Sequence, residues 1–428
     1  MKYCKSFVLN KKLVSIAITS VLIISACGEK TTSTSGAGFN NSANTNTDFD
    51  QGKLVSSIVD NVITPNYQQF YALANDQQQA ISDYCGQEIL FDQGESSQSL
   101  VDESMLNAQQ RWRGAMDSWQ KAEVMQFPEF LIDGGLRNNI YSWPIKNTCG
   151  VDLDVTYFKL GTVNDQAYDI SKRTASRKSM VALEYLLFNE TLNHTCTGSV
   201  APDSWDNQTE QYRKIARCEY ASEVAKDVTN NAQQLLTQWL GTDGVSGYAQ
   251  TLKSAGTNDN EFATDHDAVN EISNAIFYLD LFTKDGKLAE PLGLFANECG
   301  AQACPEVVES KYSQYSIENI INNLQALKEF MQGQVTSETS LIEGAIGFRD
   351  YLIDVGDQET ADSIDANIIT AITNAQAYEM SLAETLTADE DKVLQTHTDV
   401  KNITDQLKTD FINSLALELP KTAAGDND

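Results

Sequence analysis

Hydrophobic residues recur every three or four positions along much of this chain, the spacing of one apolar face of a helix. The spacing is clear in four segments, at Met105, Ala108, Trp112, Met116 and Trp119, at Ile317, Ile320, Leu324, Leu327 and Met331, at Ile364, Ile368 and Ile372, and at Val400, Ile403, Leu407 and Phe411. Period-two alternation is scarce, and the 428 residues include only seven prolines. The pattern therefore predicts an all-α protein built from long helices.

Polar residues at the ends of these segments predict where helices begin and end. Ser316 is expected to cap one helix, and Gly333 to end it. Thr387 with Glu390 has the spacing of a capping box at the start of the last helix. The acidic run Asp389-Glu390-Asp391 is explained by the same helix start, because carboxylates interact favourably with the positive end of the helix dipole.

Interruptions of the helical pattern predict the domain organisation. Three stretches that contain cysteines or prolines are expected to form long loops at bundle ends, namely 126–170, 189–209 and 284–313. A stretch rich in Gly, Ser, Thr and Asp near 241–260 predicts a boundary. We therefore expect two helical-bundle modules packed side by side, at 51–241 and 260–420, with disulfide-stapled loops.

The N-terminus has the pattern of a secretory signal. Four lysines precede an apolar run from Leu13 to Ile24, and Ser25-Ala26 lead into Cys27, which looks like a bacterial lipobox. The run is too short for a comfortable membrane span. We expect residues 1–26 to be a lipoprotein signal peptide, Cys27 to carry the lipid (palmitate), and residues 27–50, poor in apolar side chains, to be a flexible linker. The residue after Cys27 is Gly28 and not Asp, which favours an outer-membrane lipoprotein on the periplasmic face or the cell surface.

The charge of the chain excludes nucleic-acid partners. Thirty lysines and arginines against 60 acidic residues give a net charge of −30, and loss of residues 1–26 removes four lysines and no acid. Such a surface repels phosphate backbones and attracts cations, including metal ions. It also keeps an exported protein soluble.

The cysteines predict disulfides rather than a metal site. Besides Cys4 and Cys27 there are six, and an even number in an oxidising compartment is typical of disulfides. Proximity in sequence favours Cys299–Cys304 and Cys196–Cys218, which leaves Cys85–Cys149. The competing zinc site lacks a Cys-x-x-Cys pair and a nearby histidine cluster.

Common catalytic motifs are absent, and the most unusual polar residue is Glu184. The only histidines, His194, His266 and His397, are far apart in sequence. Glu184 lies within Met180–Phe188, an otherwise apolar helical segment with a single tyrosine. A buried carboxylate needs a partner, and the candidates are Arg173, Arg177 and Arg137. The alternatives are a functional group, a buried ion pair and a cap on a neighbouring helix.

Several sequence blocks resemble the imelysin family, named after an insulin-cleaving bacterial peptidase. These blocks are Pro65 with Tyr67, Arg111-Trp112 with Trp119 and Glu123, Tyr141-Ser142-Trp143-Pro144, Ala182–Phe188, Gly286-Lys287-Leu288 with Pro291-Leu292-Gly293, and Glu309-Ser310 with Tyr312-Ser313. The resemblance covers nearly the whole chain after Cys27. It implies an all-α fold of two helical modules and an association with iron uptake and other periplasmic binding roles.

The chain departs from the family pattern at the family's signature, Gly-x-His-x-x-Glu. Ser179 replaces the glycine, Val181 replaces the histidine, and only Glu184 remains. A His and a Glu three residues apart share a helix face and can bind one metal ion. Valine cannot bind a metal ion, so this chain lacks a residue that a metallopeptidase would need to hold its metal-bound water or to act as general base.

We therefore expect a lipid-anchored, non-catalytic binding protein of the cell envelope, linked to iron uptake. Its ligand would occupy a cleft lined by Glu184, Trp143 and Arg137, whereas Trp112 and Trp119 are better explained as core. No resident cofactor is expected, and iron or another divalent metal is the candidate ligand, with Glu184 the single candidate metal ligand. The partners would be the membrane and iron-uptake proteins. The alternatives are a metallopeptidase with an altered site, for example Glu184 with His194, and a structural surface lipoprotein.

Overall fold

The computed structural model describes residues 33–34, 48–127, 135–202, 204–335, 342–420 and 423. From Ser33 onward the chain forms one compact unit. The predicted signal peptide, Cys27 and most of the predicted linker lie outside the described residues. Within the described ranges, no helix combines the length and the apolar composition that crossing a bilayer requires.

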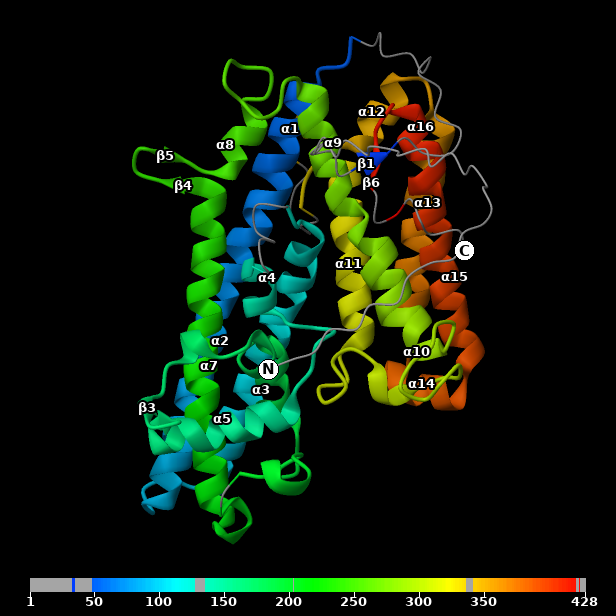
Figure 1. Ribbon diagram of the computed structural model, residues 1–428. Coiled ribbons are helices and arrows are strands. Elements are labelled where there is room, and N and C mark those ends of the chain that lie inside the picture. The colour runs from blue at the N-terminus through cyan, green and yellow to red at the C-terminus, as the bar shows by residue number, and fades with distance from the viewer. Residues whose placement is uncertain are drawn as a thin grey trace, which may run out of the picture. The chain divides into compact units, whose positions relative to one another are not determined.

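The described chain is helical almost throughout, which confirms the all-α prediction (Figure 1). Up to residue 240 it forms α1 (Gln51–Ile58), the π-helical turn η1 (Val59–Ile63), α2 (Thr64–Asp92), α3 (Gln98–Val124), α4 (Gly135–Ile140), α5 (Thr148–Leu160), the short 3-10 turns η4 (Ile170–Lys172) and η5 (Ala175–Arg177), α6 (Met180–Phe188), the 3-10 turns η6 (Gly198–Val200) and η7 (Trp205–Asn207), and α7 (Glu210–Leu240).

Shorter helices and a long π-helix fill the second half of the described chain. They are α8 (Tyr248–Lys253), α9 (Asp265–Ile276), the π-helix η8 (Leu279–Ala289), α10 (Glu290–Leu292), the 3-10 turn η9 (Pro305–Val307), α11 (Ser316–Gln332), α12 (Phe348–Asp354), α13 (Gln358–Gln376), α14 (Leu382–Ala388), α15 (Glu390–Gln406), the π-turn η10 (Leu407–Phe411) and α16 (Ile412–Ser414).

Each strand in the described chain is two residues long, and the strands form antiparallel pairs. They are β1 (Ser33–Thr34) with β6 (Leu419–Pro420), β2 (Thr162–Val163) with β3 (Gln166–Ala167), and β4 (Gly241–Thr242) with β5 (Val245–Ser246). These short ribbons close turns and do not form a layer of the fold.

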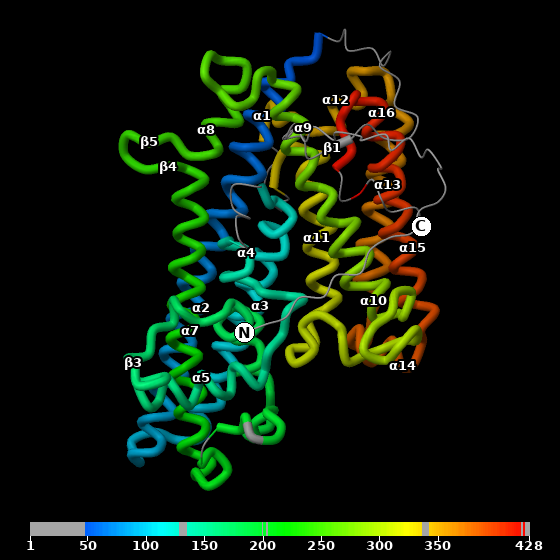
Figure 2. The backbone as a smooth tube through the Cα atoms, in the orientation of Figure 1, coloured from blue at the N-terminus to red at the C-terminus, as the bar shows by residue number. Residues whose placement is uncertain are grey.

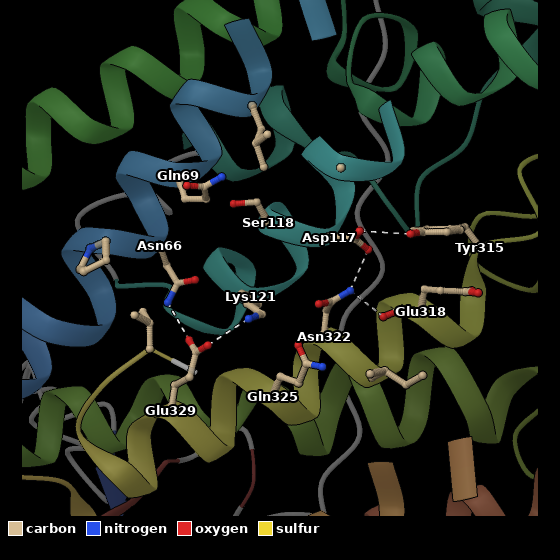
Figure 3. Close-up of a pocket in the computed structure, with 15 residues that line it drawn as sticks. Asn66, Gln69, Asp117, Ser118, Lys121, Tyr315, Glu318, Asn322, Gln325 and Glu329 are labelled. Carbon is tan, nitrogen blue, oxygen red and sulfur yellow. Dashed lines mark hydrogen bonds and ion pairs between the residues drawn. The ribbon is translucent and has the colours of Figure 1, made fainter. Parts of the chain in front are cut away.

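Helix α3 connects two groups of helices. It packs along α2, which also packs along α7, and on another side it contacts α11. Helix α11 in turn packs against α13, and α13 against α15, as the tube in Figure 2 allows the reader to follow. A cavity of about 600 Å³ is lined by residues of α2, α3 and α11 (Figure 3). The predicted module boundaries at 241 and 260 stay a prediction.

Helix ends follow local chemistry, with two corrections to the predicted caps. Gly333 ends α11 as predicted, with φ of 68°, and a Cβ there would collide with the carbonyl of Ile346. Ser316, however, is the first residue of α11 and not its cap. Thr387 does not cap the later helix either, because Asp389 is the N-cap of α15 and accepts a hydrogen bond from the main chain of Lys392.

Two of the three predicted loops contain helices. Stretch 126–170 holds α4 and α5, and stretch 284–313 begins inside η8 and continues into α10. The periodicity of apolar residues did not predict α5, because this helix is short. Its ends are nevertheless well defined, since Asn147 caps it by accepting from the main chain of Gly150 and Gly161 ends it with φ of 72°.

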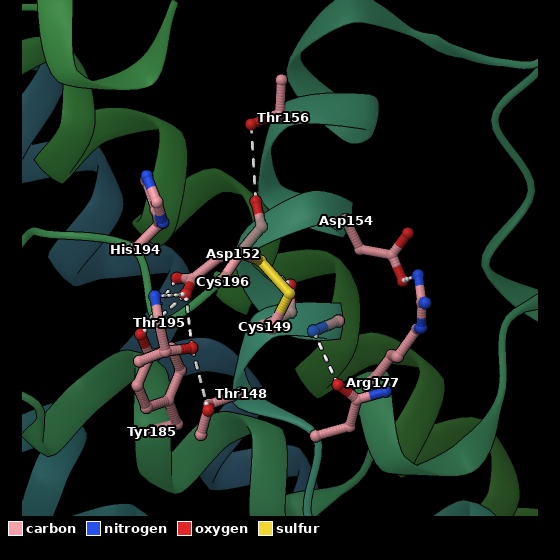
Figure 4. The surroundings of a disulfide bond; sticks show 12 residues. Thr148, Cys149, Asp152, Asp154, Thr156, Arg177, Tyr185, His194, Thr195 and Cys196 are labelled. Carbon is pink, nitrogen blue, oxygen red and sulfur yellow. Dashed lines mark hydrogen bonds and ion pairs between the residues drawn. A yellow bond between two sulfur atoms is a disulfide. The ribbon is translucent and has the colours of Figure 1, made fainter. Parts of the chain in front are cut away.

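All six cysteines in the described part of the chain form disulfides, but only one pairing was predicted correctly. Cys299 pairs with Cys304, whereas Cys85 pairs with Cys218 and Cys149 with Cys196. The predictions Cys196–Cys218 and Cys85–Cys149 are wrong because α2 and α7 pack along each other and bring Cys85 to Cys218. Figure 4 shows the Cys149–Cys196 bridge beside Asp152 of α5. Asp152 accepts a hydrogen bond from the main chain of Thr195 at 2.7 Å.

Candidate ligand-binding site

Helix α6 lies in the interior of the molecule. Every residue from Met180 to Leu187 is buried, as its nearly uninterrupted apolar composition predicts. Glu184 is 5% exposed. A carboxylate at this place was expected to have a partner, and the structure supplies one.

The partner of Glu184 is Ser313, in the segment that precedes α11. The Ser313 main-chain N–H donates to Oε1 of Glu184 at 2.9 Å, and the Ser313 hydroxyl donates to the same oxygen at 3.0 Å. Two donors on one oxygen stabilise the ionised form of a buried carboxyl group. The two residues are 129 positions apart in the chain, so this contact connects α6 to the segment that precedes α11.

The three arginines predicted as partners of Glu184 pair with other acids. Arg173 and Arg177 lie 2.7 and 3.6 Å from the carboxylate of Asp154. Arg137 lies 2.5 Å from Glu123. The prediction is wrong because α5 and α3 place their own buried carboxylates, Asp154 and Glu123, beside these guanidinium groups, and a buried charge requires a counter-charge.

Glu184 lines a cavity of about 250 Å³. Lys146, Tyr185, Tyr312 and Lys311 lie on its wall as well. Burial raises the pKa of Glu184, while the main-chain hydrogen bond from Ser313 and the positive charge of Lys146 lower it. Glu298 and Glu306 are also on the wall, so the cavity presents three acids, two lysines and two phenol rings to a ligand.

Val181 faces the same cavity as Glu184. It is 8% exposed and lies one turn before Glu184 on α6. The position where the family signature has histidine is thus correctly placed for a second metal ligand, but an isopropyl group cannot be one. Among the described residues, no group of three or more His, Cys, Asp or Glu side chains has the geometry to hold a metal ion. These residues do not fit a resident catalytic metal.

Trp143 and Arg137, the other predicted ligand contacts, lie in packed interior rather than on this cavity. Trp143 is 2% exposed, and a Cβ on Gly286 would lie 2.7 Å from its Cη2 atom. Arg137 donates to the Trp143 carbonyl and to Glu123. Of the three predicted side chains, the structure brings only Glu184 to the cavity.

A buried polar cluster beneath Trp143 connects the blocks singled out in the sequence. Lys287 Nζ lies 3.2 Å from Glu309 and donates to Asn323 of α11 at 2.8 Å. The Tyr141 hydroxyl donates to Glu309 at 2.7 Å. These residues come from four separate segments, so their contacts hold those segments together.

His194, the alternative ligand considered with Glu184, pairs elsewhere. Its Nε2 atom lies 3.5 Å from Asp206, and it is not among the residues that line the Glu184 cavity. Sequence reasoning missed four charged residues on the cavity wall, namely Lys146, Glu298, Glu306 and Lys311. All four are in segments without periodicity, so the sequence offered no signal for them.

Comparisons with known proteins give the family. The family model described as Imelysin matches residues 63–409. Iron-regulated protein A of Synechococcus elongatus is 24% identical over 282 residues, an alignment that covers 66% of this chain and 64% of the relative. The chain therefore spans just under two thirds of the length of that relative.

Two solved structures share the fold. One is assigned as an iron-regulated protein A precursor from Parabacteroides distasonis, with a TM-score of 0.61, 16% identity, and coverage of 88% of this chain and 98% of that chain. The other is an imelysin-like protein from Psychrobacter arcticum, with a TM-score of 0.56, 13% identity, and coverage of 87% and 98%. At these identities the similarity shows the fold alone.

Proposed function

Because this chain belongs to the imelysin family, we propose that it is a non-catalytic binding protein of the cell envelope that serves iron uptake. The observation that carries the proposal is the shared cavity of Val181 and Glu184. The cavity and its buried acid are present, while the neighbouring position offers no ligand for a catalytic metal. A binding role needs the cavity and the acid, whereas hydrolysis needs the missing imidazole as well.

Two relatives named for regulation by iron support the iron-related part of the proposal. Those names describe the relatives, and here they only direct the choice of ligand. The cavity wall has the carboxylates of Glu184, Glu298 and Glu306 but no His or Cys, and no group of three such side chains in the described chain has the geometry to hold a metal ion, so it is a poor site for a bare iron ion. The ligand we propose is therefore iron in complex with a small organic acid.

A second cavity supports this choice of ligand. It has a volume of about 530 Å³, is lined by Lys172, Arg173 and Arg177, and shares Asn147 and Ser176 with the Glu184 cavity. Guanidinium groups bind carboxylates well. Arg173 and Arg177 are partly neutralised by Asp154, but Asp154 leaves them a net positive charge. An anionic iron complex would place its carboxylates here and its other end beside Glu184.

The proposal includes a lipid anchor at Cys27 in the outer membrane, with iron-uptake proteins as partners. Its support is the lysine-rich start, the short apolar run and the Ser25-Ala26-Cys27 sequence. Mass spectrometry of the mature protein tests it. The expected N-terminal peptide begins at Cys27 and carries acyl chains, and Cys27→Ala abolishes the modification. An unmodified N-terminus at another residue contradicts it.

Thermal unfolding of the mature protein in detergent tests the binding role. Ferric citrate is expected to raise the melting temperature of the wild type, because a ligand that binds only the folded state stabilises it. Glu184→Gln should lose this shift. Glu88→Gln is the matched control, since Glu88 is also buried and accepts hydrogen bonds from Tyr84 and Gln211 on another part of the fold. No shift in the wild type would favour a structural lipoprotein.

The metallopeptidase alternative has its own test. Hydrolysis of the insulin B chain is measured with added zinc, with a chelator, and with Glu184→Gln. We expect no hydrolysis above the buffer rate. Chelator-sensitive hydrolysis that Glu184→Gln abolishes would replace the proposal with the peptidase.

A further inference from the structure

The cavity among α2, α3 and α11 shares no lining residue with the Glu184 cavity. Its volume of about 600 Å³ lies in the range of small-molecule sites. Figure 3 shows Asn66 and Gln69 on α2, Asp117, Ser118 and Lys121 on α3, and Glu318, Asn322, Gln325 and Glu329 on α11, gathered around it. Nothing in the Glu184 site uses these residues.

Asp117 is the acid at the centre of this wall. It accepts from the Tyr315 hydroxyl at 3.1 Å and from the Asn322 amide at 2.9 Å. Burial raises its pKa to about 6, and Lys121 is the one cation that opposes this. No lysine or arginine of the described chain forms an ion pair with Asp117, so it is an ionised acid at neutral pH that lacks a counter-charge in contact.

Lys121 does not provide that counter-charge, because it is committed to another acid. Its Nζ lies 2.9 Å from Glu329, which is fully buried and also accepts from the Asn66 amide at 2.8 Å. The wall therefore has three carboxylates, those of Asp117, Glu318 and Glu329, against one ammonium group. The cavity is net negative and favours a cationic ligand.

Ser118 provides an independent sign of a ligand. It is 6% exposed, and its hydroxyl has no hydrogen-bond partner within the described part of the chain. Figure 3 shows the hydroxyl directed from α3 toward Gln69 of α2, on the wall of the cavity. A buried hydroxyl without a partner carries a desolvation cost that a ligand donor can remove.

We propose that this cavity binds a small organic cation with a primary ammonium group at each end of a short methylene chain. One ammonium group would contact Asp117, and the hydroxyl of Ser118 would accept a hydrogen bond from it or from the second group. The apolar side chains of Pro65, Leu73 and Ile321 on the wall would contact the methylene carbons. An ammonium group donates three hydrogen bonds and accepts none, which matches a wall of carboxylate, amide and hydroxyl oxygens.

Isothermal titration calorimetry of the mature protein with 1,4-diaminobutane at pH 7.5 tests the proposal. The expected result is saturable binding at one site. 1,4-Butanediol, which has the same length and no charge, should bind at least tenfold more weakly. Asp117→Asn should weaken diamine binding at least tenfold, and Ser118→Ala about threefold.

Three control variants separate the proposal from other outcomes. Gly114→Leu blocks the cavity from a helix position where a Cβ meets nothing within 4 Å, so it should fold and lose binding. Exposed Asp410→Asn and the Glu184→Gln variant should bind as the wild type does. Weak, non-saturable binding that Gly114→Leu retains would mean general attraction to an acidic surface and would overturn the proposal, as would equal affinity for the diol.

Discussion

Oε1 of Glu184 accepts two hydrogen bonds from Ser313, one from its main-chain N–H at 2.9 Å and one from its hydroxyl at 3.0 Å. The acid is fixed in position by a residue 129 places later in the chain. It is thus held at the wall of its cavity before any ligand arrives. This pre-organisation suits a binding site.

Ser313→Ala should destabilise the protein by about 1–2 kcal/mol, because it removes one of the two donors to a buried carboxyl oxygen. Urea unfolding followed by circular dichroism measures the change. With Glu184→Gln already present, the same substitution should have a smaller effect. Additive effects in this double-mutant cycle would contradict the coupling of the two residues.

Gly286→Ala should destabilise the protein by about 1–3 kcal/mol, because the added methyl group lies 2.7 Å from Cη2 of the buried Trp143. Gly86→Ala is the matched control. A Cβ there meets nothing within 4 Å inside α2, so it should stabilise by about 0.5–1 kcal/mol. Equal effects at the two glycines would show that the contact with Trp143 is not close-packed.

Loss of the Cys85–Cys218 bridge should have a much larger effect than loss of Cys299–Cys304. The first closes 133 residues and the second five. Loop entropy gives about 5 kcal/mol for the first and about 2 kcal/mol for the second at 25 °C. Replacing each pair by alanine and measuring urea unfolding compares them. A larger loss from the short loop would be inconsistent with this account.

Asp117 should give the protein an unusual pH dependence. Its pKa in the folded state, about 6, lies above the ordinary 3.8, so between these values the folded chain binds more protons than the unfolded one. Stability from this group is therefore present at low pH and lost as the pH rises toward 6. As the pH rises from 4 to 7.5, the free energy of unfolding of Asp117→Asn should increase relative to that of the wild type by up to about 3 kcal/mol. A difference that does not vary with pH contradicts the shift.

Val181→His should create a zinc site, because it places an imidazole one turn from Glu184 on the wall of the same cavity. Zinc affinity by calorimetry is expected to rise at least tenfold. Val181→Leu, which fills similar space without a ligand atom, should leave it unchanged. If Val181→His adds no affinity, positions 181 and 184 do not share one ligand space.

The sequence allowed the helices and the burial of Glu184 to be predicted, because both depend on local pattern. The apolar run of α6 leaves no face for solvent, and Gly333 supplies the positive φ that ends α11. The partners of Glu184 could not be predicted in the same way. Arg173 and Arg177 are near Glu184 in sequence, yet both form ion pairs with Asp154 of α5. Tertiary packing determines which acid these arginines contact.

The diamine cavity had no recognisable pattern in the sequence. Asp117, Ser118 and Lys121 lie within little more than one turn of α3, and polar residues on a helix are usually its solvent-exposed face. Their partners, Asn322 and Glu329, are about 200 residues later on α11. Only the packing of α3 against α11 shows that these side chains enclose a space.

The Glu184 cavity is expected to bind an iron complex. Calorimetric titration of the mature protein with ferric citrate, with citrate alone as the reference, tests it most directly. We expect one saturable site in the wild type and in Glu88→Gln, and binding at least tenfold weaker in Glu184→Gln. Equal affinity in all three proteins, or no binding to the wild type, would contradict it.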